Sequence, residues 1–350
     1  MPSTAGQLAD RPTDQPTDQP TDEEFLQVTG PYRRELLAHC YRMLGSVHEA
    51  EDLVQETYLR AWRSYHGFEG RSSLRTWLYR IATNVCLTAL DGRSRRPLPT
   101  GLGAPSSDPA DPLVQRSEVL WLEPAPSALV DGDPNDPASI VTTRASVRLA
   151  LIAALQHLPP RQRAVLVLRD VLRLRAAEVA EMLDTSVAAV NSSLQRARAQ
   201  LDDAGLTEED VVEPSDPAQR ALLDRYAKAL EAKDVSAIVD AFTADAVWEM
   251  PPFTSWFQGP AAIARLVDTH CPAGPGELRL LRTEANGQPA YAVYLLGDKG
   301  WQPFQLQVLA LTDGRISHVA AFFDLTLFPT FGLPASLPEE NLGELASATP

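Results

Sequence analysis

The stretch from Glu49 to Cys86 constrains the fold most, because it carries two helical repeats of apolar residues around a short polar loop. The first repeat comprises Ala50, Leu53, Val54, Thr57, Tyr58 and Ala61, and the second comprises Leu74, Trp77, Leu78, Ile81, Ala82 and Val85. Apolar residues three and four positions apart lie on one face of an α-helix. The stretch therefore predicts two amphipathic helices, each burying one stripe.

The loop between these helices, residues 66–73, places Phe68 between two glycines, and Ser72 or Ser73 is positioned to cap the second helix. The side of that helix away from the apolar stripe is expected to carry Thr76, Arg80, Thr83 and Asn84. An exposed ring beside Arg, Asn and Ser side chains suits the capture of an unstacked nucleic-acid base. The same residue types are also typical of an ordinary helical bundle with a core and a solvated face.

Charge is distributed unevenly along the 350 residues. The net charge is −15, yet residues 25–96 carry +4 and residues 141–205 carry +3, whereas residues 206–350 carry −11. Two basic blocks among acidic ones favour local contact with nucleic acid and argue against a protein that coats it non-specifically.

The sequence lacks paired cysteines, a membrane-spanning apolar run and a signal peptide, and these absences guide the expected compartment and cofactor use. Cys40, Cys86 and Cys271 have no paired spacing, which favours reduced thiols over a disulfide framework or a thiolate metal site. No apolar run reaches the roughly 18 residues of a membrane span, and the N-terminus lacks the pattern of a signal peptide. We therefore expect a cytoplasmic protein with no metal, no cofactor and no membrane contact.

The N-terminal half divides by composition. Residues 1–24 contain the repeat PTDQPTDQPTD and are expected to form a disordered acidic tail. A helical module follows over residues 25–96 and ends in a basic patch, Arg93-Ser94-Arg95-Arg96. Residues 97–138 are rich in Pro, Gly, Ser and Asp, which predicts a flexible linker. Trp121, within an apolar island of this linker, hints that part of it docks onto a neighbour.

A second helical module is expected over residues 139–205. Its last part, residues 172–201, predicts helix, turn and helix, with Ser186 as the cap of the final helix. An apolar seam on that helix comprises Val187, Val190, Leu194, Ala197 and Leu201, and the outward side comprises Ala188, Asn191, Ser192, Gln195, Arg196 and Arg198. Such polar side chains can pair with base edges and phosphates, although a plain helical hairpin has the same pattern.

The remainder changes character. Residues 214–333 predict helices at 214–234, 235–242 and 261–269, a turn and strand within 243–250, and strands at 278–284, 290–297, 304–312 and 316–323. Asp313-Gly314 marks a hairpin between the last two. Helices followed by a curved antiparallel sheet indicate an α+β domain, and residues 334–350 are expected to be a polar tail.

Longer strings carry a family resemblance. AEDLVQETYLRAW (50–62) and FEGRSSLRTWLYRIATN (68–84) resemble region 2 of extracytoplasmic-function sigma factors. LPPRQRAVLVLRD (158–170) and EVAEMLDTSVAAVNSSLQRAR (178–198) resemble region 4 of the same family. FTADAVWEMPP (242–252), WFQGPAAI (256–263) and ISHVAAFFD (316–324) resemble SnoaL-like cones of the nuclear-transport-factor-2 superfold. The resemblance implies a multi-domain sigma factor with two all-α modules and a C-terminal α+β cone, and no enzymatic activity.

The resemblance also implies roles for individual residues. Capture of the melted −10 element falls to Phe68 and Asn84, with Arg75, Trp77 and Arg80 at the fork, although Trp77 is equally suited to a structural role. Reading of the −35 duplex falls to Asn191, Ser192, Gln195 and Arg196, with Arg198 on phosphate. Binding to the clamp coiled coil of core RNA polymerase falls to Asp52, Gln55 and Glu56, and the resemblance also implies contact with the polymerase flap. Asn191 stands where many relatives carry a basic residue, which puts a borrowed consensus in doubt.

The C-terminal domain leaves more alternatives open. A cone of this type can enclose a pocket, with Trp248, Met250, Trp256, Phe257, His270, Tyr291 and Phe323 as candidate lining residues. A domain that contacts the helical modules in cis and regulates them is one interpretation. An enzyme with Asp245, Glu249 or His270 as general base is another. For the whole chain, the alternatives are a helix-turn-helix regulator with a ligand-sensing domain and a cone-fold enzyme with an accessory DNA module.

Overall fold

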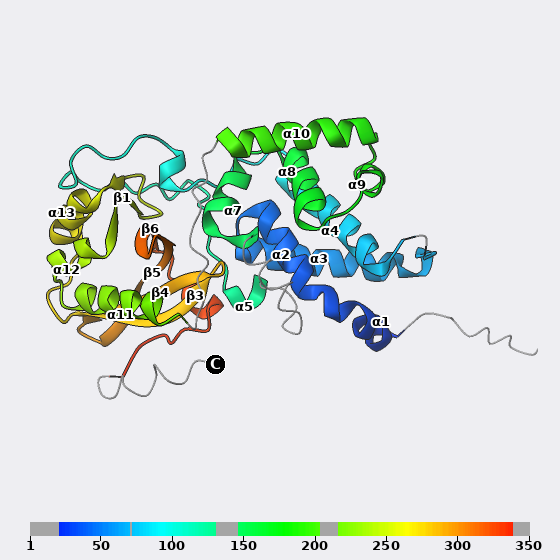
Figure 1. The fold of residues 1–350 in the computed structure, drawn as a ribbon. Helices are drawn as coiled ribbons and strands as arrows, with labels where there is room; N and C mark the ends of the chain where they lie inside the picture. Colours follow the sequence, from blue (N-terminus) through cyan, green and yellow to red (C-terminus); the bar gives the residue numbers. More distant parts are fainter. Residues whose placement is uncertain (1–20, 71, 131–145, 204–215, 339–350) are drawn as a thin grey trace, which may run out of the picture.

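A computed structural model describes residues 21–70, 72–130, 146–203 and 216–338. Figure 1 shows two groups of elements side by side: the helices of the N-terminal half, and a C-terminal domain built around one sheet. Most of the expected acidic tail (residues 1–20), the start of the second helical module (139–145) and most of the polar tail (339–350) lie outside the described residues. Within the described ranges, no helix is long and apolar enough to cross a membrane.

The first helical module contains α1 (Asp22–Thr29), α2 (Arg33–Leu44), α3 (Val47–Ser64) and α4 (Leu74–Leu90). Gly45 ends α2 with a φ of 69°, a conformation that glycine adopts without steric cost. The hydroxyls of Ser46 and Ser73 accept hydrogen bonds from the N–H groups of Glu49 and Thr76 and thereby cap α3 and α4. Both expected amphipathic helices are present, and Ser73 is the cap of the second.

One side chain of α4 contradicts its expected orientation. Thr83 is fully buried, although the helical periodicity places it on the polar side. The reason is α2, which covers this side of α4. The His39 Nε2 atom lies 2.9 Å from the Thr83 hydroxyl, and that hydroxyl donates to the Tyr79 carbonyl at 2.7 Å. The apolar stripe of one helix predicts one buried face but does not reveal whether a second neighbouring helix also covers the polar side.

The segment joining the two helical modules is packed over its described length, residues 97–130. It contains the 3-10 turn η3 (Pro99–Gly101) and the short α5 (Ser127–Val130), and it buries Leu98, Leu122, Ala125 and Val130. This differs from the flexible tether that the composition predicts. A chain that is rich in Pro and Gly cannot form a core alone, but neighbouring domains here supply the apolar surface that orders it.

The second helical module contains α7 (Leu149–Gln156), α8 (Pro160–Leu166), a π-helical turn at Val167–Val171, α9 (Ala176–Met182) and α10 (Val187–Asp203). Ser186 accepts a hydrogen bond from the Ala189 N–H at 3.2 Å and caps α10, as expected. Val190, Leu194 and Ala197 are buried, but Val187 is 44% exposed. The expected seam is therefore one turn too long, because burial at a helix end depends on neighbours that periodicity does not specify.

The C-terminal domain contains α11 (Pro217–Glu231), α12 (Val235–Asp240), α13 (Pro260–His270) and the short α14 (Leu327–Thr330). Its strands are β1 (Phe242–Glu249), β2 (Trp256–Gln258), β3 (Leu278–Ala285), β4 (Gln288–Gly297), β5 (Gly300–Thr312) and β6 (Arg315–Phe322). They form one sheet in the order β2-β1-β6-β5-β4-β3. The α+β class is confirmed.

The expected antiparallel sheet needs two corrections. Strand β1 runs parallel to β6, whereas the other neighbouring pairs are antiparallel. A parallel pair requires a long crossover connection. Here the crossover consists of the residues between Glu249 and Arg315, which include β2, α13 and strands β3 to β5. Strand β2 is missing from the expectation, because three residues show too little alternation to be recognised.

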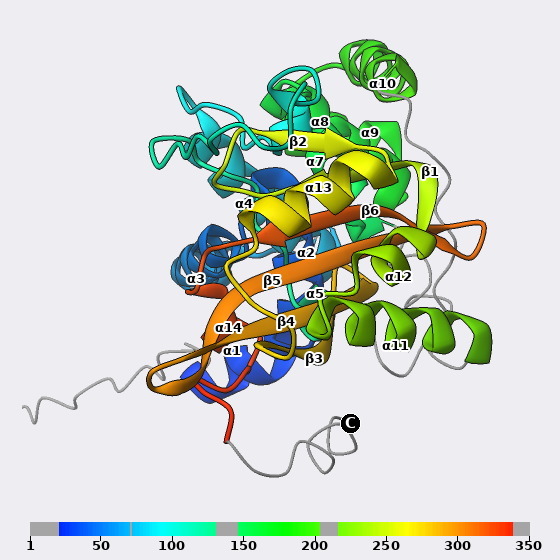
Figure 2. The ribbon, with the colours of Figure 1, turned by 90° about the vertical axis from the view of Figure 1, so that its left-hand side faces the viewer.

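Both faces of the sheet are apolar, because alternate residues of a strand point to opposite faces. On β4, Tyr291 and Val293 belong to the core beneath α11, α12 and α13. The intervening Ala290, Ala292 and Tyr294 belong to a core that continues into the helical modules. Figure 2 shows α11, α12 and α13 on the near side of the sheet and α2 and α3 on its far side. The C-terminal domain is thus attached to the helical modules through one face of its own sheet.

Candidate nucleic-acid interface

Three aromatic rings meet where α3 leads into α4. The centroid of the Phe68 ring lies 5.0 Å from that of Trp77 and 6.4 Å from that of Tyr65, to which it is inclined by 20°. All three side chains are half-buried. Phe68 is therefore part of a small aromatic cluster and not the isolated exposed ring that the loop predicts. The cluster leaves one partly open aromatic surface at the start of α4.

Arg75 is fixed by its neighbours. Its guanidinium lies 2.7 Å from the Glu35 carboxylate on α2 and 5.0 Å from the centroid of the Tyr79 ring. The Tyr79 hydroxyl donates to the same carboxylate at 3.0 Å. Burial, together with this carboxylate, raises the pKa of Tyr79 above its usual range, so the phenol stays protonated. Arg75 can reach a nucleic acid only by exchanging this partner.

The remaining candidates on α4 face outward. Asn84 is exposed, and the side chain of Arg80 is 50% exposed. The Arg80 guanidinium lies 3.9 Å from the carboxylate of Glu181, which belongs to α9 of the second helical module. The two candidate nucleic-acid-binding modules are therefore neighbours at this surface.

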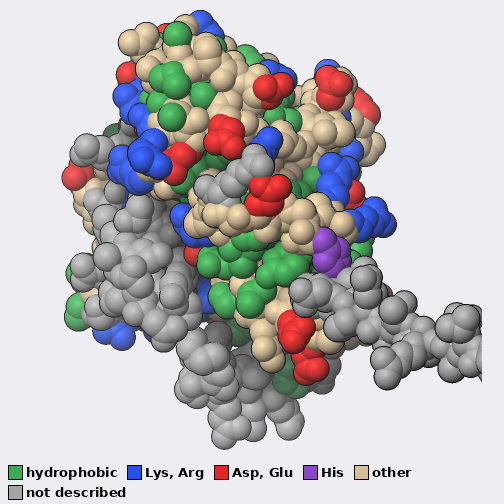
Figure 3. Space-filling model, turned by 90° about the vertical axis from the view of Figure 1, so that its right-hand side faces the viewer, with side chains coloured by type: hydrophobic (Ala, Val, Ile, Leu, Met, Phe, Trp, Pro, Cys, Tyr) green, Lys and Arg blue, Asp and Glu red, His purple; other side chains and the backbone are tan. Residues whose placement is uncertain are grey.

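The outward side of α10 is exposed as expected, and one of its arginines pairs with a carboxylate of the π-helical turn at Val167–Val171. Asn191, Gln195 and Arg196 are exposed, and Ser192 is half-buried. Arg196 donates to the Ser192 hydroxyl at 2.7 Å. Arg198 binds the carboxylate of Asp170 through two hydrogen bonds of 2.9 and 2.6 Å. Figure 3 shows basic, acidic and hydrophobic side chains interspersed over the face of the helical modules that it displays.

The polar side of α3 carries the candidate polymerase-binding residues. Asp52 and Gln55 are exposed, whereas Glu56 pairs with Arg60 at 2.7 Å on the same helix. Leu59, one turn further along, is 51% exposed. An exposed leucine beside unpaired polar groups suits a protein contact better than a purely solvated face.

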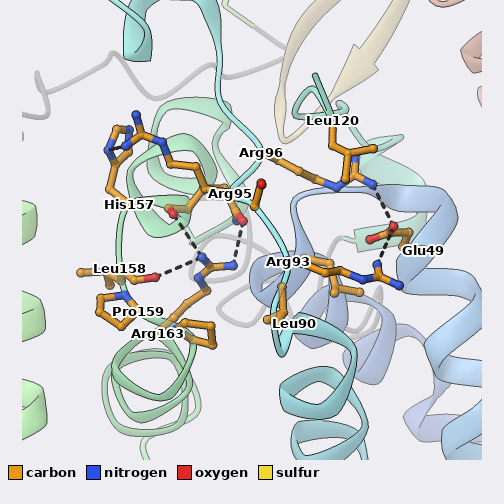
Figure 4. Close-up of a pocket in the computed structure, with 14 residues that line it drawn as sticks. Glu49, Leu90, Arg93, Arg95, Arg96, Leu120, His157, Leu158, Pro159 and Arg163 are labelled. Atoms are coloured by element: carbon orange, nitrogen blue, oxygen red, sulfur yellow. Dashed lines mark hydrogen bonds and ion pairs between the residues drawn. The ribbon is translucent and has the colours of Figure 1, made fainter. Parts of the chain in front are cut away.

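A cavity of about 320 Å³ lies between the two helical modules, and Figure 4 shows its walls. Arg93 and Arg96 both pair with Glu49 at 2.9 Å on one side. On the other side Arg163 of α8 is almost fully buried and donates to the carbonyls of Met43 and Leu158. Burial lowers the pKa of Arg163 to about 10. Sequence reasoning did not single out Arg163, although it is an arginine on a helix face that is otherwise apolar.

Glu123 of the linker connects three parts of the molecule. Its carboxylate accepts from the Ser46 hydroxyl at 2.8 Å and lies 3.0 Å from Nδ1 of His48 and 3.5 Å from Arg96. His48 Nε2 lies 2.8 Å from the hydroxyl of Thr330 on α14. The first module, the linker and the C-terminal domain thus share one polar cluster.

The turn between β3 and β4 makes a second connection. Asn286 is fully buried, and its side-chain amide donates to the Tyr41 hydroxyl at 2.8 Å and to the Val147 carbonyl at 2.6 Å. Its side-chain carbonyl accepts from the Ala125 N–H at 3.0 Å. One amide therefore joins both helical modules and the linker. No sequence signal marks Asn286 beyond its place in an Asn-Gly turn.

The C-terminal domain encloses a second cavity of about 320 Å³. Four of the expected lining residues surround it: Trp248, Met250, His270 and Phe323. Trp256, Phe257 and Tyr291 are not among its lining residues. The Trp256 indole instead donates to the Gly103 carbonyl of the linker, the Tyr291 hydroxyl donates to the Leu223 carbonyl, and Phe257 is buried in the core.

The proposed general bases are placed apart. The Glu249 carboxylate is fully buried and lies 2.8 Å from Nε2 of His318 and 2.9 Å from the Thr100 N–H that donates to it. It does not line the cavity, and neither does Asp245; of the three only His270 does. The structure therefore brings together no pair of the three candidate bases.

Comparison with protein families matches three consecutive parts of the chain. Residues 30–96 match the model of Sigma-70 region 2, residues 148–201 match Sigma-70 region 4, and residues 223–319 match the SnoaL-like domain.

Individual proteins match along most of the chain. The ECF RNA polymerase sigma factor SigG of Mycobacterium tuberculosis is 60% identical over 316 residues, which cover 90% of this chain and 85% of SigG. The ECF RNA polymerase sigma factor SigJ of the same organism is 30% identical over 301 residues, covering 81% of this chain and 86% of SigJ. The crystal structure of M. tuberculosis SigJ superimposes with a TM-score of 0.57 at 23% identity and covers 89% of this chain and 100% of SigJ.

Proposed function

The chain belongs to the extracytoplasmic-function (ECF) family of RNA polymerase sigma factors, and we propose how its described surfaces divide the work of promoter recognition. In this proposal α3 binds core RNA polymerase, α4 and the loop before it capture the melted −10 element, and α10 reads the −35 duplex. The SnoaL-like domain regulates these steps in cis.

The −10 assignment uses the aromatic cluster and the outward side of α4. The half-buried ring of Phe68, supported by Trp77 and Tyr65, offers a stacking surface for an unpaired base. Exposed Asn84 offers hydrogen bonds to a base edge, and Arg80 offers a charge at the fork. Arg75, held by Glu35, positions the start of α4 and contacts the backbone only after that ion pair opens.

The −35 assignment uses the exposed residues of α10. Asn191 and Gln195 present amides that suit adenine, and Arg196 suits guanine. Ser192 adds a hydroxyl, and Arg198 at the far end of this side suits phosphate. Polymerase binding is assigned to Asp52, Gln55 and Glu56 on the clamp coiled coil, and to the second helical module on the flap.

The observation that carries the regulatory part is the close packing of the two promoter readers. Arg80 of α4 and Glu181 of α9 are 3.9 Å apart, and buried Arg163 holds α8 to the end of α2. The −10 and −35 elements are about 25 base pairs apart by position, which is roughly 85 Å of duplex at 3.4 Å per base pair. The packed arrangement therefore has to open before both elements are bound.

The C-terminal domain supports the packed arrangement. Asn286 binds groups from both helical modules and from the linker between them, so this turn loses its partners when the modules separate. The apolar far side of the sheet adds to the same contact. We therefore assign the domain an inhibitory sign: it stabilises the closed form.

Run-off transcription with bacterial core polymerase tests this function. The full chain is compared with a truncation ending at Asp203 on a set of genomic promoters. Transcripts from both, with more from the truncation, would support the proposal. Equal amounts would count against inhibition in cis, and duplex binding with no transcript from either would contradict the sigma assignment.

A further inference from the structure

The cavity of the C-terminal domain is lined almost entirely by apolar side chains. Its lining residues come mainly from strands β1, β3 and β5 and from α11 and α13, two of the helices that Figure 2 shows over this face of the sheet. Its lining includes Leu230, Met250, Leu266, Val267, Leu278 and Phe304. Its volume of about 320 Å³ is at the lower end of the range of small-molecule sites.

Two polar groups in this lining lack partners. The indole Nε1 of Trp248 and the imidazole Nε2 of His270 are buried and have no hydrogen-bond partner among the described residues. Trp248 is only 3% exposed. A buried donor without an acceptor costs about 1–3 kcal/mol, and native proteins rarely leave two beside one cavity. The indole N–H can only donate, so the missing partner is an acceptor.

The lining also limits the charge of an occupant. Among the described residues that line the cavity, the ionisable side chains are the imidazole of His270 and the thiol of Cys271. A charged group transferred there would lose its hydration without gaining an ion pair. An occupant is therefore neutral and mostly apolar.

We propose that this cavity binds a neutral apolar small molecule bearing a carbonyl-type acceptor, and that its occupancy holds the inter-module linker in place. Trp248 donates to the acceptor, and His270 supplies a second hydrogen bond. The aromatic rings of Phe253, Phe304 and Phe323, in edge-to-face contact at 5.3–5.4 Å, enclose the apolar part.

The coupling rests on Leu113, a linker residue that lines the same cavity. The chain beside it is attached to the rim: the Thr254 N–H donates to the Val114 carbonyl at 2.9 Å, and the Arg116 N–H donates to the Pro252 carbonyl at 3.0 Å. A ligand that touches Leu113 gains contacts only while the linker is docked. It therefore shifts the population toward the closed form and reduces transcription.

The test uses the full chain and the neutral naphthyl ketone prodan, whose emission shifts to shorter wavelength in apolar surroundings. We expect saturable binding with a blue shift. In Trp248→Phe, which keeps a ring and removes the N–H, we expect weaker binding. In Val267→Trp, which fills the cavity, we expect none, and Leu266→Phe serves if that variant misfolds. Full binding to a folded, filled variant, or no saturable binding to the parent chain, would overturn the site.

Limited trypsin digestion at Arg116, the basic residue between Pro97 and Val130, reports release of the linker. If only the docked form binds, free prodan at ten times its dissociation constant slows this cleavage about tenfold. Leu113→Ala should abolish the protection, whereas Leu120→Ala, an exposed leucine of the same linker, should preserve it. An unchanged cleavage rate at saturation would overturn the coupling. The regulatory consequence rests on the proposed function, but binding and cleavage are measured without polymerase, so the two can fail separately.

Discussion

The side-chain amide of Asn286 donates a 2.8 Å hydrogen bond to the hydroxyl of Tyr41, a residue of the first helical module that lies 245 positions earlier in the chain. Tyr41 in turn donates to the carbonyl of Glu123 in the linker at 2.8 Å. Burial raises the pKa of Tyr41 above its usual range, so this phenol remains a donor. Asn286, Tyr41 and Glu123 therefore form one chain of hydrogen bonds that connects the sheet, region 2 and the linker.

Replacing Asn286 should loosen the closed form. Asn286→Ala leaves the Ala125 N–H and the Val147 carbonyl unpaired, which we expect to weaken domain docking by about 3 kcal/mol. Faster trypsin cleavage at Arg116 and more run-off transcript measure the effect. Asn286 has a φ of 57°, which alanine adopts only with strain and glycine adopts freely. Asn286→Gly therefore removes the same hydrogen bonds without backbone strain, and comparison of the two variants separates the two effects. Wild-type cleavage rates in both variants would contradict the role of this turn.

Acidification should destabilise region 2 through His39. Burial, and then the nearby charge of Arg42, lowers the pKa of His39 from 6.5 to about 3. Between these two pKa values the unfolded chain binds a proton that the folded chain does not. The contribution of neutral His39 to the free energy of unfolding is therefore fully present above pH 6.5 and is lost as the pH drops. The slope from this group is about 1.4 kcal/mol per pH unit. Denaturant titrations of the parent and His39→Gln should differ by this slope. Exposed His66→Gln is the control and should leave it unchanged.

Arg198 should report the phosphate contact of α10. Arg198→Ala is expected to reduce the slope of log affinity against log salt for −35 duplex by about 1. Asp170→Asn should have the opposite effect on affinity, because it removes the negative charge and one of the two acceptor oxygens that hold the same guanidinium. Fluorescence anisotropy at several salt concentrations measures both. A parallel change in the two variants would mean that the ion pair itself, and not the free arginine, supports binding.

Phe68 should matter for melted DNA only. Base stacking on an aromatic ring contributes about 1–3 kcal/mol, so Phe68→Ala should lower open-complex formation roughly tenfold or more. Binding of the isolated −35 duplex should not change. Permanganate footprinting of the holoenzyme and duplex anisotropy separate the two steps. Leu26→Ala, on an exposed side of α1, is the matched control. Equal loss in both assays would point to misfolding of the aromatic cluster.

Local patterns predicted much of the fold. The period of residues 49–86 predicted α3 and α4, the Ser186 cap predicted the start of α10, and alternation predicted β3 to β6 with ends that differ by a few residues. The predictions were wrong where a residue distant in sequence determines whether a side chain is buried or how a strand pairs. Thr83 is buried by His39, β1 pairs in parallel with β6, and Trp256 faces the linker. For the pocket, residue types correctly indicated an aromatic lining. Only the topology shows that Trp248 lines the cavity, whereas Phe257 is buried in the core.

The sequence by itself determined the family, the order of the three domains and most of the surface side chains on α3, α4 and α10, with Thr83 of α4 as the exception. Those properties depend on residue types and short-range periodicity, which a single chain displays directly. Only the tertiary structure decided that the linker is packed, that Asn286 joins three segments and that Leu113 of the linker lines the cavity of the C-terminal domain. These contacts join residues that lie far apart in the chain, from 77 positions for Ser46 and Glu123 to 245 for Tyr41 and Asn286, and their energies depend on burial and mutual geometry, which no local pattern encodes.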